Sequence, residues 1–260
     1  MMNIGFIGTG HMGASLALAI KDNSSFFLYL NNRNIAKAIT LSEKINNSKT
    51  VSIEEIVKDC PYIFIGVKPI DIKDVLIRIN ELKYQGIIIS MAAGIEMKEM
   101  RKYISNPIIR IMPNTPVLVK SGLTLVNYSS NVNEKMKEDF LLMMKETGDI
   151  KEVKEEEINP ISVITGSAPA YIDYVIDALI KAAVKEGLDE KEATYYVLKM
   201  MEGTIKLDLA SNKSPLELGK EVCSPGGSTI EGVNVLIKNN IYDIINRAYL
   251  ATLNKNKKMI

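Results

Sequence analysis

Six residues near the start of the chain have the types and spacing of a phosphate-binding turn. Gly8, Gly10 and Gly13 form a G-x-G-x-x-G pattern, which the apolar run Ile4–Ile7 precedes and the helix-forming run Ala14–Ile20 follows. Gly8 permits a tight turn, Gly10 lets the backbone approach a pyrophosphate, and Gly13 allows a helix to pack closely on a strand. The helix N-terminus offers unpaired N–H groups to an anion. The pattern predicts a dinucleotide-binding site, and a packing turn without a ligand is the alternative.

Polar residues about twenty positions beyond this turn bear on which dinucleotide binds. NAD enzymes usually have Asp or Glu there, to bind the ribose hydroxyls, whereas this chain has Asn31, Asn32 and Arg33. The planar guanidinium of Arg33 can bind a 2′-phosphate, and Asn32 can donate a hydrogen bond without repelling it. We therefore expect NADP(H) as the preferred cofactor, with NAD(H) possible; otherwise Arg33 merely caps a surface loop.

Two further candidate segments follow predicted strands. Val67-Lys68-Pro69 ends the apolar run that begins at Tyr62, and Ala92-Ala93-Gly94 follows the run Gly86–Ser90. An open α/β sheet binds its ligand beyond the carboxyl ends of its strands. The position of Lys68 therefore favours a role in binding over a solvated lysine.

A second glycine-rich turn lies in the C-terminal half. The segment Ser224-Pro225-Gly226-Gly227-Ser228-Thr229 precedes the apolar, helix-like run Ile230–Ile237. Backbone N–H groups of Gly226, Gly227, Ser228 and Thr229 could hold a carboxylate, and the two hydroxyls could reach a polar ligand atom. The alternative is ordinary helix capping by Ser228 or Thr229.

Two kinds of domain must position these motifs. Residues 1–154 alternate strand-like and helix-like segments, which predicts an α/β fold with a Rossmann-type, doubly wound, mostly parallel sheet. From Glu155 onward apolar residues recur at helical spacing, which predicts an all-helical domain over 155–260. The segment Thr194–Leu209 is apolar on nearly all sides of the predicted helix. One small domain cannot bury that much apolar surface, so we expect a homodimer.

Composition excludes several function classes. The 260 residues carry 32 basic and 31 acidic side chains, a net charge of +1, which argues against nucleic acid or an anionic membrane as the main partner. One histidine, His11, and two cysteines, Cys60 and Cys223, are too few for a multi-histidine metal site, a zinc cluster or a disulfide framework. We expect no metal. No uninterrupted apolar stretch reaches about 18 residues, so neither a signal peptide nor a membrane span is expected, and we expect a cytoplasmic protein.

Taken together, the motifs resemble those of pyrroline-5-carboxylate reductases, which catalyse the last step of proline biosynthesis. The resemblance runs nearly end to end. Besides the segments above, it rests on Gly5-Phe6-Ile7-Gly8, Arg110-Ile111-Met112-Pro113-Asn114 and Gly166-Ser167-Ala168-Pro169-Ala170-Tyr171.

This resemblance implies NADPH-dependent reduction of 1-pyrroline-5-carboxylate, a small imino acid, to L-proline by a homodimer, which some members stack into larger rings. It implies that the cofactor is held by Gly8, Thr9, Gly10, His11, Met12, Gly13, Asn32, Arg33, Val67, Lys68, Pro69, Ala92, Ala93 and Gly94. Met112, Pro113 and Asn114 would lie near the nicotinamide. The backbone of Gly226, Gly227, Ser228 and Thr229 would bind the substrate carboxylate, and the Thr229 hydroxyl would act as the catalytic group facing the ring nitrogen.

Some positions depart from the family's pattern. Ile53 stands where many members have an asparagine near the adenosine, and Asn212 where some have a glutamate near the substrate loop. Cys223, beside that loop, is either a redox handle or the small buried filler that a lone cysteine more often is.

Other functions remain open on the sequence. A β-hydroxyacid dehydrogenase has a similar layout but carries a catalytic lysine in a glycine-rich stretch opening the helical domain, and residues Thr165–Tyr171 contain none. A reductase of another cyclic imine, such as the six-membered homologue, also remains open, because the sequence does not give the size of the pocket. A non-catalytic NADP-binding regulator would leave the segment Ser224–Thr229 unexplained.

Overall fold

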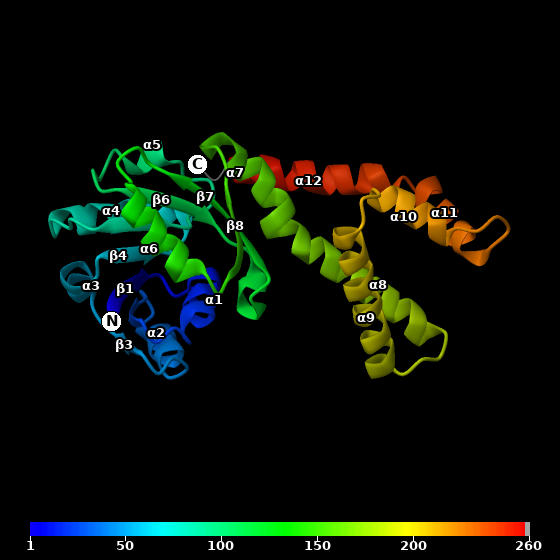
Figure 1. Ribbon diagram of the computed structural model, residues 1–260, viewed down its shortest axis with the longest axis horizontal. Helices are drawn as coiled ribbons and strands as arrows, with labels where there is room; N and C mark the ends of the chain where they lie inside the picture. Colours follow the sequence, from blue (N-terminus) through cyan, green and yellow to red (C-terminus); the bar gives the residue numbers. More distant parts are fainter. Residues whose placement is uncertain (258–260) are drawn as a thin grey trace. The chain divides into compact units, whose positions relative to one another are not determined.

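The computed structural model describes residues 1–257, which divide into two compact units (Figure 1). Unit 1 comprises Met1–Gly166 and the described residues from Leu253 on, and unit 2 comprises Ser167–Thr252. The division falls within one helical run, made of α7 (Glu155–Ser162), the π-helical turn η3 (Val163–Ser167) and α8 (Ala168–Lys185).

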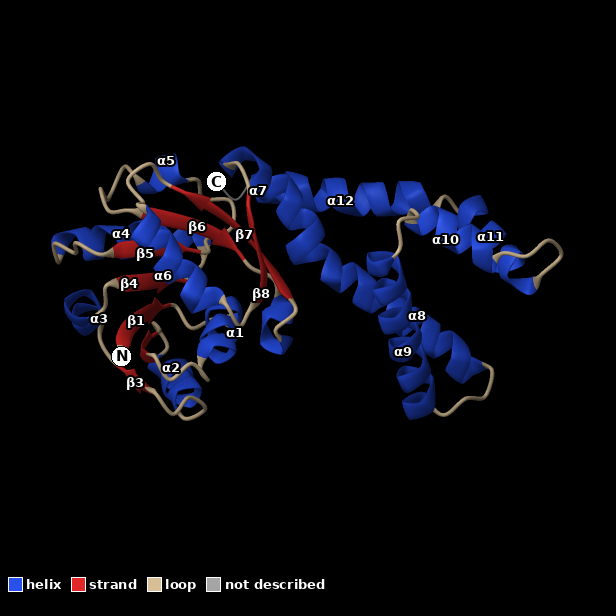
Figure 2. Cartoon of the chain, viewed as in Figure 1, coloured by secondary structure: helices blue, strands red, loops and turns tan. Residues whose placement is uncertain are grey.

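Unit 1 is built on an eight-stranded sheet in the order β3-β2-β1-β4-β5-β6-β7-β8, drawn in red in Figure 2. The strands are β1 (Met2–Ile7), β2 (Phe26–Asn31), β3 (Ser48–Thr50), β4 (Tyr62–Ile65), β5 (Ile87–Ser90), β6 (Ile108–Met112), β7 (Gly122–Tyr128) and β8 (Gly148–Glu152). The first six pair in parallel, β7 is antiparallel to β6, and β8 is parallel to β7. The order 3-2-1-4-5-6 is that of dinucleotide-binding domains, so the predicted fold class is confirmed.

Helices cover both faces of this sheet because the strands are apolar on both sides. One core joins the sheet to α1 (His11–Ile20), α2 (Ile35–Ser42) and α6 (Glu134–Met144), and includes the stacked rings of Phe6 and Phe64. The other joins it to α3 (Ile53–Asp59), α4 (Ile72–Glu81) and α5 (Met97–Met100). The sheet is therefore doubly wound, as expected.

Two strands were not anticipated from the sequence. β3 is three residues long and β8 reads Gly-Asp-Ile-Lys-Glu, and both lie at an edge of the sheet. An edge strand can stay polar because one side faces solvent, so it lacks the apolar run that reveals a buried strand.

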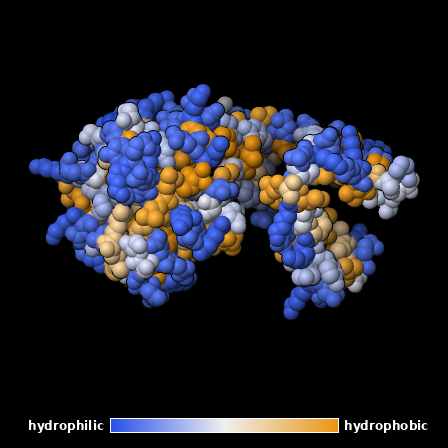
Figure 3. Space-filling model, in the orientation of Figure 1, coloured by the Kyte–Doolittle hydropathy of each residue, from blue (hydrophilic) through white to orange (hydrophobic). Residues whose placement is uncertain are grey.

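Unit 2 is all helical, as predicted. Its helices are α8, α9 (Glu190–Ala210), α10 (Pro215–Val222), α11 (Ser228–Lys238) and most of α12 (Ile241–Lys257). Within residues 167–252 only Ala193 is buried, whereas large apolar side chains such as Tyr195, Ile205 and Leu207 are exposed. Hydrophobic side chains accordingly reach the surface along these helices (Figure 3). Unit 2 has almost no core of its own.

One helical run is long and apolar enough to cross a membrane by length and composition. It spans Glu155–Lys185, and 6% of its apolar window is buried. No such run was expected from the sequence, because scattered charged residues interrupt the apolar stretch.

Candidate cofactor and substrate sites

The glycine turn after β1 has the close contacts that its sequence predicts. Gly8 adopts a φ of 93°, and a Cβ there would lie 2.7 Å from the backbone of Gly66. A Cβ on Gly13 would lie 2.2 Å from the carbonyl oxygen of Gly8. Glycine at both positions is therefore required by the protein's own packing, since any side chain would collide with backbone.

Gly10 and Thr9 are not explained by packing in the same way. Gly10 has a φ of −71°, and a Cβ there would meet only the Gly66 carbonyl oxygen, at 3.9 Å. It is the N-cap of α1 and contributes no side-chain cap, so the first N–H groups of the helix are free to bind an anion. The Thr9 hydroxyl is buried without a hydrogen-bond partner in the described part of the chain. Room for close approach, free amides and an orphan hydroxyl fit a bound pyrophosphate.

A cleft of about 580 Å³ lies at the carboxyl ends of β1, β2 and β4. From the predicted set it is lined by Gly8, Gly10, Asn32, Arg33, Val67 and Lys68. Ile53 also lines it and presents an apolar side chain there. Because β1 and β4 start crossovers in opposite directions along the sheet, the cleft lies at the topological switch point, where such folds bind nucleotides.

The cleft does contain acidic residues. Asp71 and Asp74 line it, and the Asp71 Oδ1 atom lies 3.1 Å from Nη1 of Arg33. The sequence shows no carboxylate at the end of β2, but the fold brings two into the cleft from the segment that follows β4. Asp71 reaches the cleft from the 3-10 turn η1 (Pro69–Asp71), and only its position shortly after the end of β4 hints at this in the sequence.

The remaining predicted cofactor residues lie nearby but do not line the cleft. Thr9 and His11 line a neighbouring hollow of about 520 Å³ between α1 and α2. The others are Met12, Gly13, Pro69, Ala92, Ala93, Gly94, Met112, Pro113 and Asn114. Since β5 and β6 run parallel to β1 and β4, the segments after Ser90 and Met112 leave the sheet at the same edge as the glycine turn.

The side chain of Asn114 is engaged within unit 1. Its Nδ2 donates to the carbonyl oxygen of Thr165 at 3.0 Å, and its Oδ1 accepts from the backbone N–H of Leu123 at 2.9 Å. The amide thus joins the segment after β6 to η3 and to β7. A contact of Asn114 with nicotinamide remains a prediction, and its amide already has this structural role.

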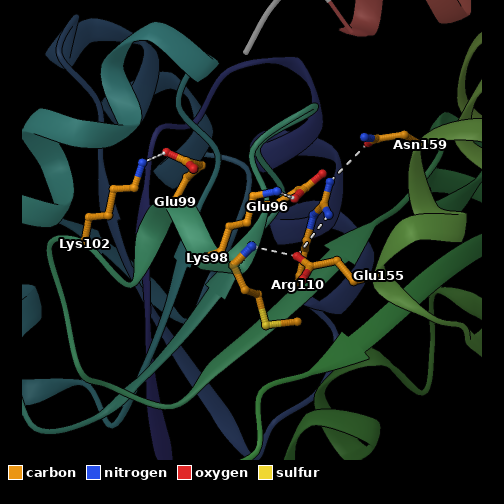
Figure 4. Close-up of polar contacts among 8 residues, drawn as sticks. Glu96, Lys98, Glu99, Lys102, Arg110, Glu155 and Asn159 are labelled. Atoms are coloured by element: carbon orange, nitrogen blue, oxygen red, sulfur yellow. Dashed lines mark hydrogen bonds and ion pairs between the residues drawn. The ribbon is translucent and has the colours of Figure 1, made fainter.

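Arg110 is a buried charge to which the sequence assigned no role. It is 0% exposed on β6, and its guanidinium donates to Glu155 and Asn159 on α7, each at 3.1 Å (Figure 4). Burial lowers the pKa of Arg110, and the adjacent Glu155 opposes that shift. Glu155 also accepts from the backbone N–H of Met97 at 2.6 Å. This network ties the start of α7 to the strand that leads into Met112.

The turn before α11 presents backbone donors. Gly226 adopts a φ of +71°, and the Gly227 N–H donates to the carbonyl oxygen of Ser224 at 3.0 Å. The N-cap of α11 is Gly227, and no side chain caps the helix. Capping by Ser228 or Thr229 is therefore wrong: they occupy the first two helical positions, both exposed, and their hydroxyls have no hydrogen bond within residues 1–257. The free amides and hydroxyls can bind a carboxylate and a second polar atom.

Comparisons with known proteins decide the family. A family model described as pyrroline-5-carboxylate reductase dimerisation matches residues 155–259, and one described as NADP oxidoreductase, coenzyme F420-dependent, matches residues 3–94. A pyrroline-5-carboxylate reductase of Staphylococcus aureus is 30% identical over 251 residues, which are 94% of this chain and 92% of the relative. The chain belongs to the pyrroline-5-carboxylate reductase family. The resemblance inferred from its motifs is confirmed.

Other pyrroline-5-carboxylate reductases are similar to this chain over nearly its whole length. One from Staphylococcus epidermidis is 28% identical over 99% of this chain and 98% of its own length. The crystal structure of the Plasmodium falciparum pyrroline carboxylate reductase with NADP bound has a TM-score of 0.89 and 29% identity, covering 99% of this chain and 98% of that chain. The Streptococcus pyogenes enzyme has a TM-score of 0.92 and 26% identity, with the same coverage.

Proposed function

We propose that the protein reduces the C=N bond of 1-pyrroline-5-carboxylate to give L-proline, with NADPH as the preferred reductant. The observation that carries the proposal is the uncapped start of α11, where Gly227 supplies no side chain and the amides of the first turn are free for a carboxylate. A chain that also has a dinucleotide cleft then has sites for both reactants. A β-hydroxyacid dehydrogenase is disfavoured because Thr165–Tyr171 contains no lysine.

The backbone around α11 binds and orients the substrate. The N–H groups of Gly226, Ser228 and Thr229 hold its carboxylate, an anion that the partial positive charge of a helix N-terminus favours. The sequence also pointed to the Gly227 N–H, but that group donates to the carbonyl oxygen of Ser224 and shapes the turn. The Thr229 hydroxyl contacts the ring nitrogen, and this contact fixes which face of the ring is presented. Thr229 is the catalytic residue in this proposal.

The hydride-transfer step does not require a strong acid from the protein. When bound, NADPH supplies a hydride for the C=N carbon. A ring imine protonates far more readily than a carbonyl, so the iminium form needs no strong general acid in that step. Thr229 holds the nitrogen and passes its proton to or from solvent. A chain whose one histidine, His11, lies in the glycine turn can therefore act as a reductase.

The dinucleotide cleft of unit 1 holds the cofactor. The amides at the start of α1 and the Thr9 hydroxyl bind the pyrophosphate, and Arg33 binds the 2′-phosphate. Asn32, Val67 and Lys68 line this cleft, and we assign them to the adenosine end of the cofactor. Preference for NADPH depends on Arg33, and NADH remains an acceptable cofactor.

The functional assembly is a homodimer joined through residues 155–260, with a domain boundary at 154/155. Two observations support this: the match to a dimerisation family begins at residue 155, and unit 2 buries only Ala193. A second copy covers the exposed apolar side chains, which include those of the run Glu155–Lys185, so this run needs no membrane. We place the enzyme in the cytoplasm. Assembly of dimers into a larger ring is compatible with the family.

The decisive experiment is NADPH oxidation by the purified protein with 1-pyrroline-5-carboxylate, run beside β-hydroxyacids with NADP⁺ and the six-membered cyclic imine. Turnover with the five-membered imine at least tenfold more efficient than with either alternative supports the proposal. Faster turnover of the six-membered imine or of a hydroxyacid contradicts the substrate. NADPH binding without turnover of any of them would indicate a regulator.

A further inference from the structure

Asp71 brings a carboxylate into the part of the cleft where the adenosine ribose is proposed to bind. It is the last residue of η1 and the N-cap of α4, yet its side chain does not cap that helix. The carboxylate instead accepts a hydrogen bond from Nη1 of Arg33, with its side chain 31% exposed. The backbone of Asp71 therefore lies at the N-cap position of α4, but its carboxylate interacts with Arg33 and not with the helix.

The Arg33 side chain has few other interactions. Its side chain is 85% exposed, and Asp71 is its only hydrogen-bond or ion-pair partner among residues 1–257. The contact uses one guanidinium nitrogen, so it is not the bidentate geometry of a strong pair. An exposed ion pair of this kind is weak, and a phosphate carrying two charges can displace the carboxylate.

We propose that Asp71 sets how strongly the protein prefers NADPH over NADH, because its carboxylate competes with the 2′-phosphate for Arg33. The inference rests on the proposed function, which assigns Arg33 to that phosphate. When NADPH binds, the phosphate takes over the guanidinium, and the carboxylate left beside it loses its partner and repels the new anion. NADH has no 2′-phosphate and leaves the Arg33–Asp71 pair intact. Asp71 therefore lowers affinity for NADPH alone.

The other acidic residue of the cleft and its second arginine do not share this position, and the two lysines that also line it, Lys37 and Lys68, are cations that cannot compete with a phosphate for Arg33. Asp74 lines the same cleft, but it makes no hydrogen bond or ion pair within residues 1–257. Arg78 also lines it and is already paired with Glu54 and Glu81. Asp74 thus offers a matched control, because Asp74→Asn removes the same charge from the same cleft without freeing Arg33.

The test measures dissociation constants of NADPH and NADH by cofactor fluorescence, on the full chain and without substrate. The variants are Asp71→Asn, Asp74→Asn, Arg33→Ala and the double variant Arg33→Ala/Asp71→Asn. We expect Asp71→Asn to bind NADPH about 3- to 10-fold more tightly, with NADH affinity changed by less than about twofold. Asp74→Asn should change either affinity by less than about twofold, and Asp71→Asn should lose its gain in the Arg33→Ala background.

Each contrary result has a definite meaning. Unchanged or weaker NADPH binding in Asp71→Asn overturns the competition. So does an equal gain for NADH, an equal gain in Asp74→Asn, or a gain that persists without Arg33, since each of these reports the general charge of the cleft. If Arg33→Ala itself leaves NADPH binding unchanged, the proposed phosphate site is wrong. If Arg33→Ala weakens it and Asp71→Asn does nothing, only this inference fails.

Discussion

Replacing Thr229 with valine separates catalysis from stability at a single side chain. Valine keeps the branched shape and the backbone N–H but removes the hydroxyl. Thr229 is the second residue of α11, is exposed, and its hydroxyl makes no hydrogen bond within the described chain, while Gly227 caps the helix. No native interaction is therefore lost, and the free energy of unfolding should change by less than about 0.5 kcal/mol.

The catalytic effect should be much larger. A hydrogen bond to a group whose charge changes is worth about 1.5 to 3 kcal/mol. At about 1.4 kcal/mol per factor of ten, its loss from the transition state lowers kcat and kcat/KM together by roughly 10- to 100-fold. The dissociation constant of NADPH should stay the same, because Thr229 does not line the dinucleotide cleft.

Steady-state kinetics with 1-pyrroline-5-carboxylate, NADPH titration and thermal unfolding of the same preparation provide the three readouts. Thr229→Ser, which restores the hydroxyl, is the matched control and should retain most of the activity. Near-normal turnover of Thr229→Val would remove Thr229 from the catalytic site. An equal loss in Thr229→Ser would show that the methyl group, and not the hydroxyl, is what the reaction needs.

Arg33→Ala should weaken NADPH binding about tenfold and leave NADH nearly unchanged. One charge-assisted bond to the phosphate is lost, but its net contribution is reduced because the phosphate must first displace Asp71 from Arg33. Equal losses in a titration of both cofactors would contradict this. Glu155→Ala leaves the guanidinium on β6 buried without its carboxylate and should lower the free energy of unfolding by about 2 to 4 kcal/mol in urea, below the range for a fully buried pair because Glu155 is 27% exposed; a loss under about 0.5 kcal/mol would make the pair unimportant. The pKa of Asp139 is lowered by Lys135 and also by the Tyr62 hydroxyl, so this carboxylate stabilises the fold above its unfolded pKa of about 3.9, and the gain is lost as the pH falls through its lower folded pKa. Tyr62→Phe should therefore cost about 1 kcal/mol at pH 7, and the difference from the wild type should shrink below about pH 4; a pH-independent difference would exclude the hydrogen bond as its cause. Sedimentation should show a dimer, and on dilution circular dichroism should show that helical structure is lost as the dimer dissociates. A folded, active monomer would refute the dimer proposal.

The sequence by itself determined the parts of the protein that depend on local rules. Apolar strand-like runs that alternate with helix-like segments were enough to predict a parallel, doubly wound sheet, because burial on both faces favours nearly continuous apolar runs. The glycine pattern at Gly8 and Gly13 was equally readable, since backbone contacts under 3 Å permit no other residue. The dimer expectation also follows from composition along one helix.

Only the tertiary structure decided which charges meet. Arg33 and Asp71 are 38 residues apart, and Arg110 and Glu155 are 45 apart, so no periodicity connects them. Each pair forms because parallel strands bring their carboxyl ends to one edge, or because a helix begins against a buried strand. Edge strands β3 and β8 and the cap at Gly227 were missed for a related reason: their conformations depend on neighbours in space and carry no apolar pattern in the sequence. The sequence thus predicts the cleft and its glycines, whereas the ionic partner of Arg33 follows from the way the sheet folds.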